Sequence, residues 1–420
     1  MKQITTGDML HAYGSFGLHM NYAVRLTVRL TDRIDGVILA NALRKTQKRF
    51  PFLSVRIRKD SSSLYYEDNQ EPVVLLNTDD QISLNTEQTN FHVWAVCYKD
   101  DHIHLDIYHG ISDGTGMYMV LATLLFYYCA ERYGVSDHTG IRTLKDPVEP
   151  EESADPQDYL PTLDPAQMPK PRVEPAFSLI EDGGMTPATY RVWYVEIPED
   201  AFMRFTSAND ASPGTMISLL IAHTLDEMFP ERSKPITSSY IINGRPMLHS
   251  LKTHHNCVNT VFFNFNDRIK AMPFDRQCTV YRGITFIQSD EQRVAGAMTV
   301  GVSRNRMVLG MAPTYEARKN AFGQMLEGGK KLFSYMVSYV GKWRIKSLEP
   351  YIIEFWTHVP IANNFLVEIA AVNGKIFLTI HQSFAEDIVI RGFLNQLKKH
   401  GIPFQMRQAA DNDAAAFPEP

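Results

Sequence analysis

"LDIYHGISDGTG", Leu105 to Gly116, is the stretch on which the interpretation of this sequence depends. An alternating segment precedes it and a long apolar run follows it, which predicts a strand, a sharp turn and a helix. Within the turn, His109 to Gly114 contain a histidine, an aspartate and two glycines. Such a turn is either a site of chemistry or a polar loop that happens to contain a histidine.

The composition excludes several classes of protein. The 420 residues favour two or three domains with an ample core, and the net charge of −5 offers no basic excess to attract nucleic acid. The first residues lack the apolar segment of a signal peptide, and the longest apolar run is too short to span a bilayer. The four cysteines form no CxxC pair. We expect a cytoplasmic monomer with no membrane span and no nucleic-acid partner.

The chain divides into three parts. Residues 1–136 and 186–420 both mix predicted strands and helices, which indicates an α/β (α+β) fold. Residues 137–185 are dense in proline and acidic side chains, which disfavour helix interiors and central strands. We interpret them as a linker or a crossover along the surface, with plain disorder as the alternative.

The two large parts resemble one another. "FHVWAVCYKDDHIHLDIYHGISDG" and "FLVEIAAVNGKIFLTIHQSFAEDI" each predict a hairpin, a short acidic loop and a helix. With the second turn one residue shorter, Val93 corresponds to Val367 and His109 to Gln382. We infer two related lobes, of which only the first has the histidine.

His109 has the setting of a general base. In "HIHLDIYHG" the apolar positions alternate with polar ones, which places His109 on the core-facing side and Tyr108 on the opposite face. A partly dry site keeps an imidazole neutral and able to accept a proton near neutral pH. We expect Gly110 and Gly114 to permit a turn that bulkier residues would strain. A core histidine without a catalytic role is the alternative.

Asp113 begins the predicted helix and could cap it. If it is buried, its carboxylate requires a cationic partner, because an uncompensated interior charge is costly. The best candidate is Arg245 in "IINGRPML", which follows a strand with the pattern of a buried one. This pair would join the two halves of the chain beside His109.

Other chemistries are poorly supported. No GxSxG elbow, P-loop or GxGxxG fingerprint is present. Two groups contain possible metal ligands, but neither has the spacing of a standard metal site. Histidines exposed on the surface are the simpler interpretation of both groups. These groups are His102, His104 and Asp106 on one strand face, and His254, His255 and Cys257 in "THHNC". We expect no metal site.

The turn resembles the HxxxDG signature of the chloramphenicol acetyltransferase-like acyltransferases, with His109, Asp113 and Gly114 at the matching positions. This superfamily includes nonribosomal peptide condensation domains, plant BAHD acyltransferases and alcohol acetyltransferases. Condensation domains usually carry two histidines, and Tyr108 stands in the first place here. The BAHD "DFGWG" motif is absent, which disfavours that branch.

Two further segments carry the resemblance. "INGRPML" followed by "NCVNTVFFNF" is similar to the glycine-arginine segment and later strand of condensation-type members, although Cys257 and Val258 depart from that pattern. "SYVGKW", Ser338 to Trp343, is similar to the SNxG loop of the C-terminal half. The order and spacing of the three pieces match, and they cover most of the chain.

The resemblance implies a pseudo-dimer of an N-terminal lobe, 1–136, and a C-terminal lobe, 186–420, with a tunnel at their interface. It implies an alcohol O-acetyltransferase-like enzyme that moves an acyl group from acyl-CoA, a co-substrate rather than a permanently bound cofactor, to a small hydroxyl or amine acceptor. His109 would be the base, Asp113 with an arginine would shape the site, and Ser338 or Tyr108 could stabilise the oxyanion.

The sequence leaves alternatives open for the acyl donor and for whether the protein is catalytic. The CoA phosphates would favour the cations Lys330, Lys331, Lys342 and Arg344, which could equally form an ordinary solvated face. Condensation with carrier-protein thioesters would require a carrier protein in trans, because the chain contains no carrier motif. A non-catalytic condensation-like binding module is the third reading.

Overall fold

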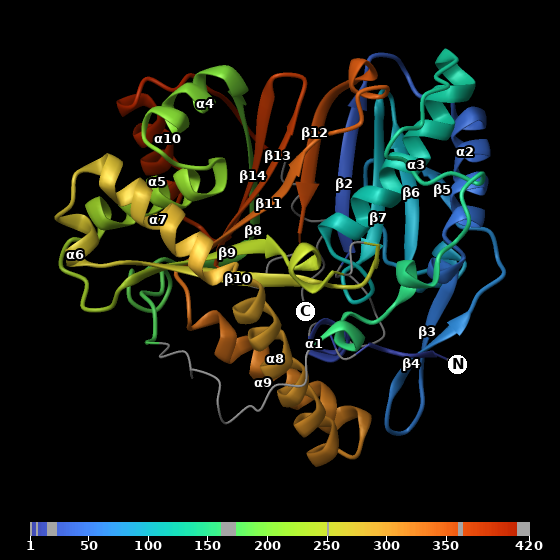
Figure 1. Cartoon of the computed structure of the whole chain (residues 1–420), viewed down its shortest axis with the longest axis horizontal. Coiled ribbons are helices and arrows are strands. Elements are labelled where there is room, and N and C mark those ends of the chain that lie inside the picture. Colours follow the sequence, from blue (N-terminus) through green and yellow to red (C-terminus); the bar gives the residue numbers. More distant parts are fainter. Residues whose placement is uncertain are drawn as a thin grey trace.

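The computed structural model describes residues 2–5, 7–14, 23–160, 174–249, 252–359 and 364–409. Two β-sheets stand beside each other in the centre of the molecule, and helices cover their outer flanks (Figure 1). The predicted α/β architecture of two lobes is therefore confirmed. Among the described residues, no helix combines the length and the apolar character that crossing a bilayer requires.

The N-terminal lobe is built on a five-stranded sheet. Its strands, in spatial order, are β12 (Ile352–His358), β2 (Ala23–Leu30), β7 (His102–Tyr108), β6 (Trp94–Lys99) and β5 (Leu75–Asn77). The helices α2 (Gly36–Arg49) and α3 (Gly114–Tyr133) pack together on its outer flank. A small sheet of β1 (Lys2–Gln3), β4 (Leu64–Asp68) and β3 (Val55–Lys59) lies below, near the short helix α1 (Met9–Gly14).

The C-terminal lobe is built on a seven-stranded sheet. Its strands, in spatial order, are β10 (Val258–Phe265), β9 (Ile236–Asn243), β11 (Tyr335–Lys342), β13 (Phe365–Val372), β14 (Lys375–Phe384), β8 (Pro187–Pro198) and β15 (Gln405–Gln408). The helices on its outer flank are α4 (Glu199–Ala208), α5 (Pro213–Met228), α6 (Asp267–Lys270), α7 (Phe274–Gln288) and α10 (Ile388–Lys399). Short 3₁₀ turns occur at Pro51–Leu53, Glu87–Thr89, Pro150–Ser153, Pro156–Tyr159, Arg245–Leu248 and Glu349–Tyr351.

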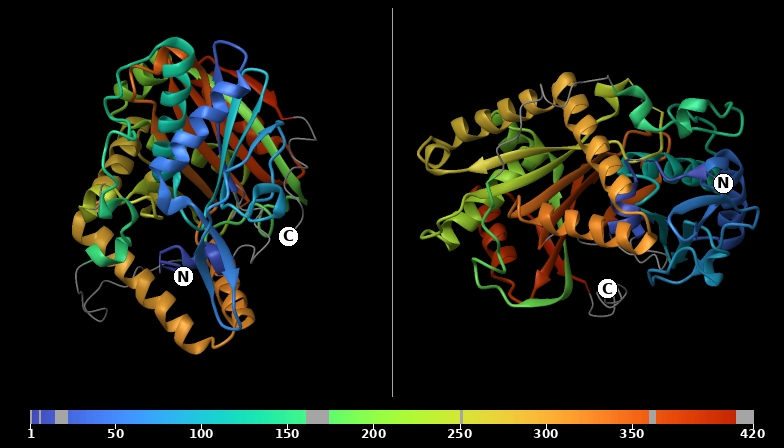
Figure 2. Two further views of the ribbon diagram at one scale, coloured as in Figure 1. Left: turned by 90° about the vertical axis from the view of Figure 1, so that its right-hand side faces the viewer. Right: turned by 90° about the horizontal axis from the view of Figure 1, so that it is seen from below.

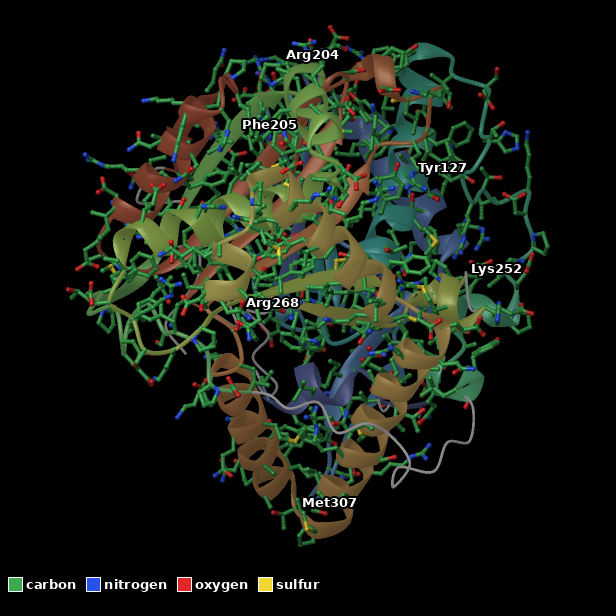
Figure 3. The ribbon with its side chains drawn as sticks, turned by 60° about the vertical axis from the view of Figure 1, so that its left-hand side comes forward. Tyr127, Arg204, Phe205, Lys252, Arg268 and Met307 are labelled. Atoms are coloured by element: carbon green, nitrogen blue, oxygen red, sulfur yellow. The ribbon has the colours of Figure 1, made fainter. Side chains whose placement is uncertain are left out.

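Two long helices, α8 (Glu291–Met311) and α9 (Tyr315–Lys330), form a hairpin that projects below the lobes (Figures 1 and 2). Met307 lies near the tip of this hairpin (Figure 3). The break between α7 and α8 comes at Asp290, whose side chain caps α8 by accepting hydrogen bonds from the backbone of Gln292 and Arg293.

The two hairpins have the predicted repeat, but their turns are equal in length. Ile107 pairs with Trp94, and Ile380 pairs with Val367, so Trp94 rather than Val93 is the counterpart of Val367. The prediction of a shorter second turn is wrong because Asp100 has a positive φ of 48°, which closes a two-residue turn without glycine. The correspondence of His109 with Gln382 is unaffected.

The two lobes do not follow the division of the sequence into an N-terminal and a C-terminal part. β12 belongs to the C-terminal part of the chain, yet it pairs with β2 as an edge strand of the N-terminal sheet, with Phe355 opposite Val28. The crossover part of 137–160 packs on the N-terminal lobe, where buried Glu152 accepts hydrogen bonds from Arg49 (2.8 Å) and Arg142 (3.0 Å). The domain limits at 136 and 185 remain predictions.

The polar side chains His104 and Asp106 of β7 are buried, and their hydrogen-bond partners come from the N-terminal lobe itself. Asp106 forms a bidentate ion pair with Arg25, with two 2.8 Å contacts. His104 accepts from the Thr27 hydroxyl through Nδ1 (2.9 Å) and donates to Asp79 through Nε2 (3.1 Å). The expectation of a surface histidine is therefore wrong for His104, since alternation does not say whether a polar face meets water or other protein groups.

Buried Glu368 on β13 makes stability depend on pH. Desolvation raises its pKa from 4.5 to about 7, against the opposing hydrogen bonds of the Ser338 and Thr357 hydroxyls. Between those two values the folded state keeps a proton that the unfolded state releases, so stability falls as pH rises through this window. We expect Glu368→Gln to stabilise the fold above pH 7 by up to about 3 kcal/mol and to have little effect at pH 4, measured by urea unfolding.

The control for this prediction is Glu181→Gln, at an exposed position. Its stability should follow the wild-type curve at every pH. A stabilisation by Glu368→Gln of the same size at pH 4 and pH 8 would contradict the assignment, because it would show that packing rather than ionisation is responsible.

Candidate functional site

The turn after β7 is shaped by close packing. Asp113 is the N-cap of α3, and its carboxylate accepts a hydrogen bond from the backbone N–H of Gly116 (3.0 Å). A Cβ on Gly116 would come within 2.4 Å of the His254 carbonyl oxygen, so only glycine fits there. The prediction that a bulkier residue would strain this turn is confirmed at Gly110 for a steric reason, since neither Gly110 nor Gly114 has a positive φ. At Gly110 the constraint is space, because a Cβ would meet the Tyr108 ring at 2.3 Å.

The ion pair expected between Asp113 and Arg245 is present and buried. The guanidinium binds both carboxylate oxygens, at 2.8 and 2.9 Å, and the side chains of Asp113 and Arg245 are 2% and 1% exposed. Asp113 also accepts from the Cys257 N–H (2.8 Å), while Arg245 donates to the carbonyls of Thr253 (2.9 Å) and His255 (2.7 Å). The pair joins the start of α3 in one lobe to the segment after β9 in the other.

His109 follows the last residue of β7 and is half-buried. Its Nδ1 lies 3.1 Å from the Ser112 carbonyl oxygen, which can only accept, so Nδ1 carries the hydrogen and Nε2 is the basic nitrogen. Desolvation lowers the pKa of His109, and the charges of Asp113 and Asp8 oppose this shift. The imidazole is therefore neutral at pH 7 and suited to removing a proton.

Several neighbours of His109 were not predicted from the sequence. The ring of His11, on α1, stacks on that of His109 with centroids 4.5 Å apart. Asn256 donates from Nδ2 to the His109 carbonyl and to Asp8, both at 2.7 Å, and His255 donates to Asp8 at the same distance. Little in the sequence indicated them. α1 has only six residues, too few for a helical pattern of apolar residues to be recognised, and "THHNC" suggested only metal ligands with an irregular spacing.

The histidines of "THHNC" belong to this packing. His254 donates from Nδ1 to the Ile111 carbonyl (3.1 Å) and stacks on Phe52, with centroids 4.6 Å apart. Across the part of the chain that the structure describes, no three His, Cys, Asp or Glu side chains are grouped so that they could hold a metal ion.

Two other residues predicted from the sequence, Tyr108 and Ser338, have different surroundings. Tyr108 is buried, and its hydroxyl donates to the His11 carbonyl (3.4 Å). Ser338 lies on β11, where its hydroxyl forms a hydrogen bond with the carboxyl group of Glu368. A role in binding the oxyanion remains a prediction for both.

The four predicted CoA-binding cations do not form one cluster. Lys330 and Lys331 precede β11, whereas Lys342 ends it and Arg344 follows, so roughly 23 Å of strand separates the two pairs. Lys330 pairs with Glu327 (2.6 Å) and Lys342 with Glu199 (2.6 Å). The Arg344 backbone N–H donates to the Tyr118 hydroxyl (3.1 Å).

A cavity of about 310 Å³ lies between the lobes. Its walls include Arg25 and His104 from the N-terminal sheet, Trp356 from β12, and Tyr194 and Arg407 from the C-terminal sheet. It follows the first half of β7, whereas His109 lies beyond the other end of that strand. Small-molecule sites are often found at such interfaces between domains.

Comparisons with solved structures identify the architecture. Polyketide synthase associated protein 5 from Mycobacterium tuberculosis aligns over 94% of this chain and 96% of its own, with a TM-score of 0.59 and 12% identity. TRI101 from F. sporotrichioides, solved with coenzyme A and T-2, aligns over 93% and 96%, with a TM-score of 0.62 and 11% identity. The chain has the chloramphenicol acetyltransferase-like fold.

The same two-lobed fold extends to a condensation domain that mediates chain release from the enacyloxin polyketide synthase. That structure aligns over 95% of this chain and 83% of its own, with a TM-score of 0.57 and 12% identity. No protein-family model and no curated protein sequence matches the chain.

Removal of the buried carboxylate tests the role of the ion pair. Asp113→Ala leaves Arg245 buried without its counter-charge, so we expect the free energy of unfolding to fall by about 3–5 kcal/mol, measured in urea. The control Asp200→Ala removes a pair with Arg204 in which both side chains are about seven-tenths exposed, and should change the free energy of unfolding far less. Equal losses in the two variants would show that burial adds nothing to the Asp113–Arg245 pair.

Proposed function

We propose that the protein is an acyltransferase that moves an acyl group from a thioester, acyl-CoA, to a hydroxyl or amine acceptor, with His109 as the general base. The observation that carries the proposal is the state of His109: a neutral imidazole whose Nδ1 is held by the Ser112 carbonyl, on a turn fixed between the two lobes. The chloramphenicol acetyltransferase-like fold supports it by likeness alone.

In the proposed reaction, Nε2 of His109 removes the acceptor proton as the acceptor oxygen or nitrogen attacks the thioester carbonyl carbon. The carbon–sulfur bond then breaks, and the departing thiolate takes the proton back from His109. General base catalysis of this kind contributes roughly 10²- to 10⁴-fold, and holding both substrates together adds a proximity effect. Asp113 is committed to Arg245, so it acts by holding the turn rather than by passing a proton.

The cations differ in their readiness to bind the CoA phosphates. Lys330 and Lys342 already bind carboxylates. Lys331 instead lines an open groove between α1 and α9 together with Lys319. TRI101 was solved with coenzyme A, which supports a CoA donor by likeness of fold only. We therefore propose Lys331 as the best placed of the three predicted lysines.

His109→Ala tests the base directly. We expect the variant to keep the wild-type circular dichroism spectrum and melting temperature and to lose about 10²- to 10⁴-fold in transfer rate, followed by thiol release from acyl-CoA. The control is His138→Ala, a histidine after α3 that does not line the cavity between the lobes, and it should keep wild-type turnover. Normal turnover by His109→Ala would reject His109 as the base.

The donor and acceptor are tested in one panel. Several acyl-CoA thioesters are mixed with alcohols and amines, and thiol release and product mass are recorded. A second arm replaces CoA with a phosphopantetheinylated carrier protein, which separates transfer from CoA from condensation in trans. Thermal protection by acyl-CoA without a product from any acceptor would favour the non-catalytic binding module.

A further inference from the structure

His11 lies directly against the candidate base. Its ring and that of His109 are nearly parallel, with an interplanar angle of 7° and centroids 4.5 Å apart. His11 is on α1, which lies outside both large sheets and packs against α9. A contact between rings from such distant segments requires that α1 be held in place.

α1 is held to both sides of His109. The buried Asp8 carboxylate accepts hydrogen bonds from Thr5 (2.6 Å), His255 (2.7 Å) and Asn256 (2.7 Å), and Asn256 also donates to the His109 carbonyl. From the strand side, the Tyr108 hydroxyl donates to the His11 carbonyl (3.4 Å). Hydrogen bonds from the segment around Asp8, from Asn256 and from Tyr108 therefore hold the two rings in contact.

We propose that His11 is a positioning residue for His109: its flat ring fixes the plane of the base and excludes water from one face. The inference rests on the proposed function, in which Nε2 of His109 must point at the acceptor. The inference extends the proposed site by one residue, His11, which contacts the proposed base and not the reacting atoms.

The charges around the pair favour a proton on His109 rather than on His11. Burial and repulsion from His109 lower the pKa of His11 to about 3, against the attraction of Asp8. On the other side, the charges of Asp113 and Asp8 oppose the desolvation that lowers the pKa of His109. On α9, Lys319 and Glu327 lie by Gly14 at the far end of α1.

A neutral His11 therefore serves His109 in both of its states. Before the reaction it keeps one face of the imidazole dry, which favours the neutral base. When His109 takes the acceptor proton, the π face of His11 lies against the imidazolium and can stabilise it. A phenylalanine would preserve both effects, whereas a small side chain would remove them.

The test compares three substitutions of His11. The pKa of His109 is measured by NMR without substrate, with His109→Ala to assign its signals, and kcat and KM are measured against pH. We expect His11→Phe to keep both the low pKa and kcat. His11→Ala should raise the pKa of His109 by about one unit and lower kcat about tenfold with little change in KM. His11→Leu, which fills the volume without a flat face, should keep the low pKa and still lose kcat.

His138→Phe is the control, because His138 also has a ring contact, with Phe126 (centroids 5.8 Å apart), and does not line the cavity between the lobes. It should leave the pKa of His109 and kcat unchanged. Wild-type pKa and kcat in His11→Ala, or in His11→Leu if the alanine variant does not fold, would overturn the inference. A shifted pKa in a protein that transfers no acyl group would reject the proposed function and leave the contact between the rings established.

Discussion

The ion pair between Asp113 and Arg245 is the interaction on which the site depends. Two buried charges are costly unless each finds its full set of partners, and here the carboxylate and the guanidinium are bound by each other and by four backbone groups. The same carboxylate caps α3, so the pair fixes the start of that helix, the turn before it and the position of His109. Electrostatics between the lobes thus determines where the proposed base lies.

Of the two related hairpins, only the one in the N-terminal lobe ends in a turn with a histidine. In the second lobe, Gln382 occupies the place of His109 on β14, and its amide donates to the carbonyls of Phe384 and Glu386 at 2.6 and 2.7 Å. A glutamine amide holds a turn by hydrogen bonds but cannot accept a proton at neutral pH. One lobe therefore provides His109, the proposed base, and the other provides Arg245, which holds its turn.

Local patterns in the sequence predicted much of the fold and part of the site. The alternation in β7, the hairpin repeat and the capping role of Asp113 all follow from neighbouring residues. The partner Arg245 followed from the cost of burying a carboxylate. Contacts over long separations were not predictable in this way: β12 joins β2 across the chain, and Asn256 reaches Asp8 over 248 residues. His11 was missed for the same reason, since nothing near it in sequence points to His109.

The most direct test of the account is affinity labelling with bromoacetyl-CoA, which places an electrophilic carbon beside the position of the thioester carbonyl. After proteolysis, mass spectrometry locates the alkylated residue. The account predicts alkylation of His109, prevented by excess CoA and reduced by Asp113→Ala even where that variant is still folded. Alkylation at other residues with His109 unmodified, or labelling that CoA does not prevent, would contradict it.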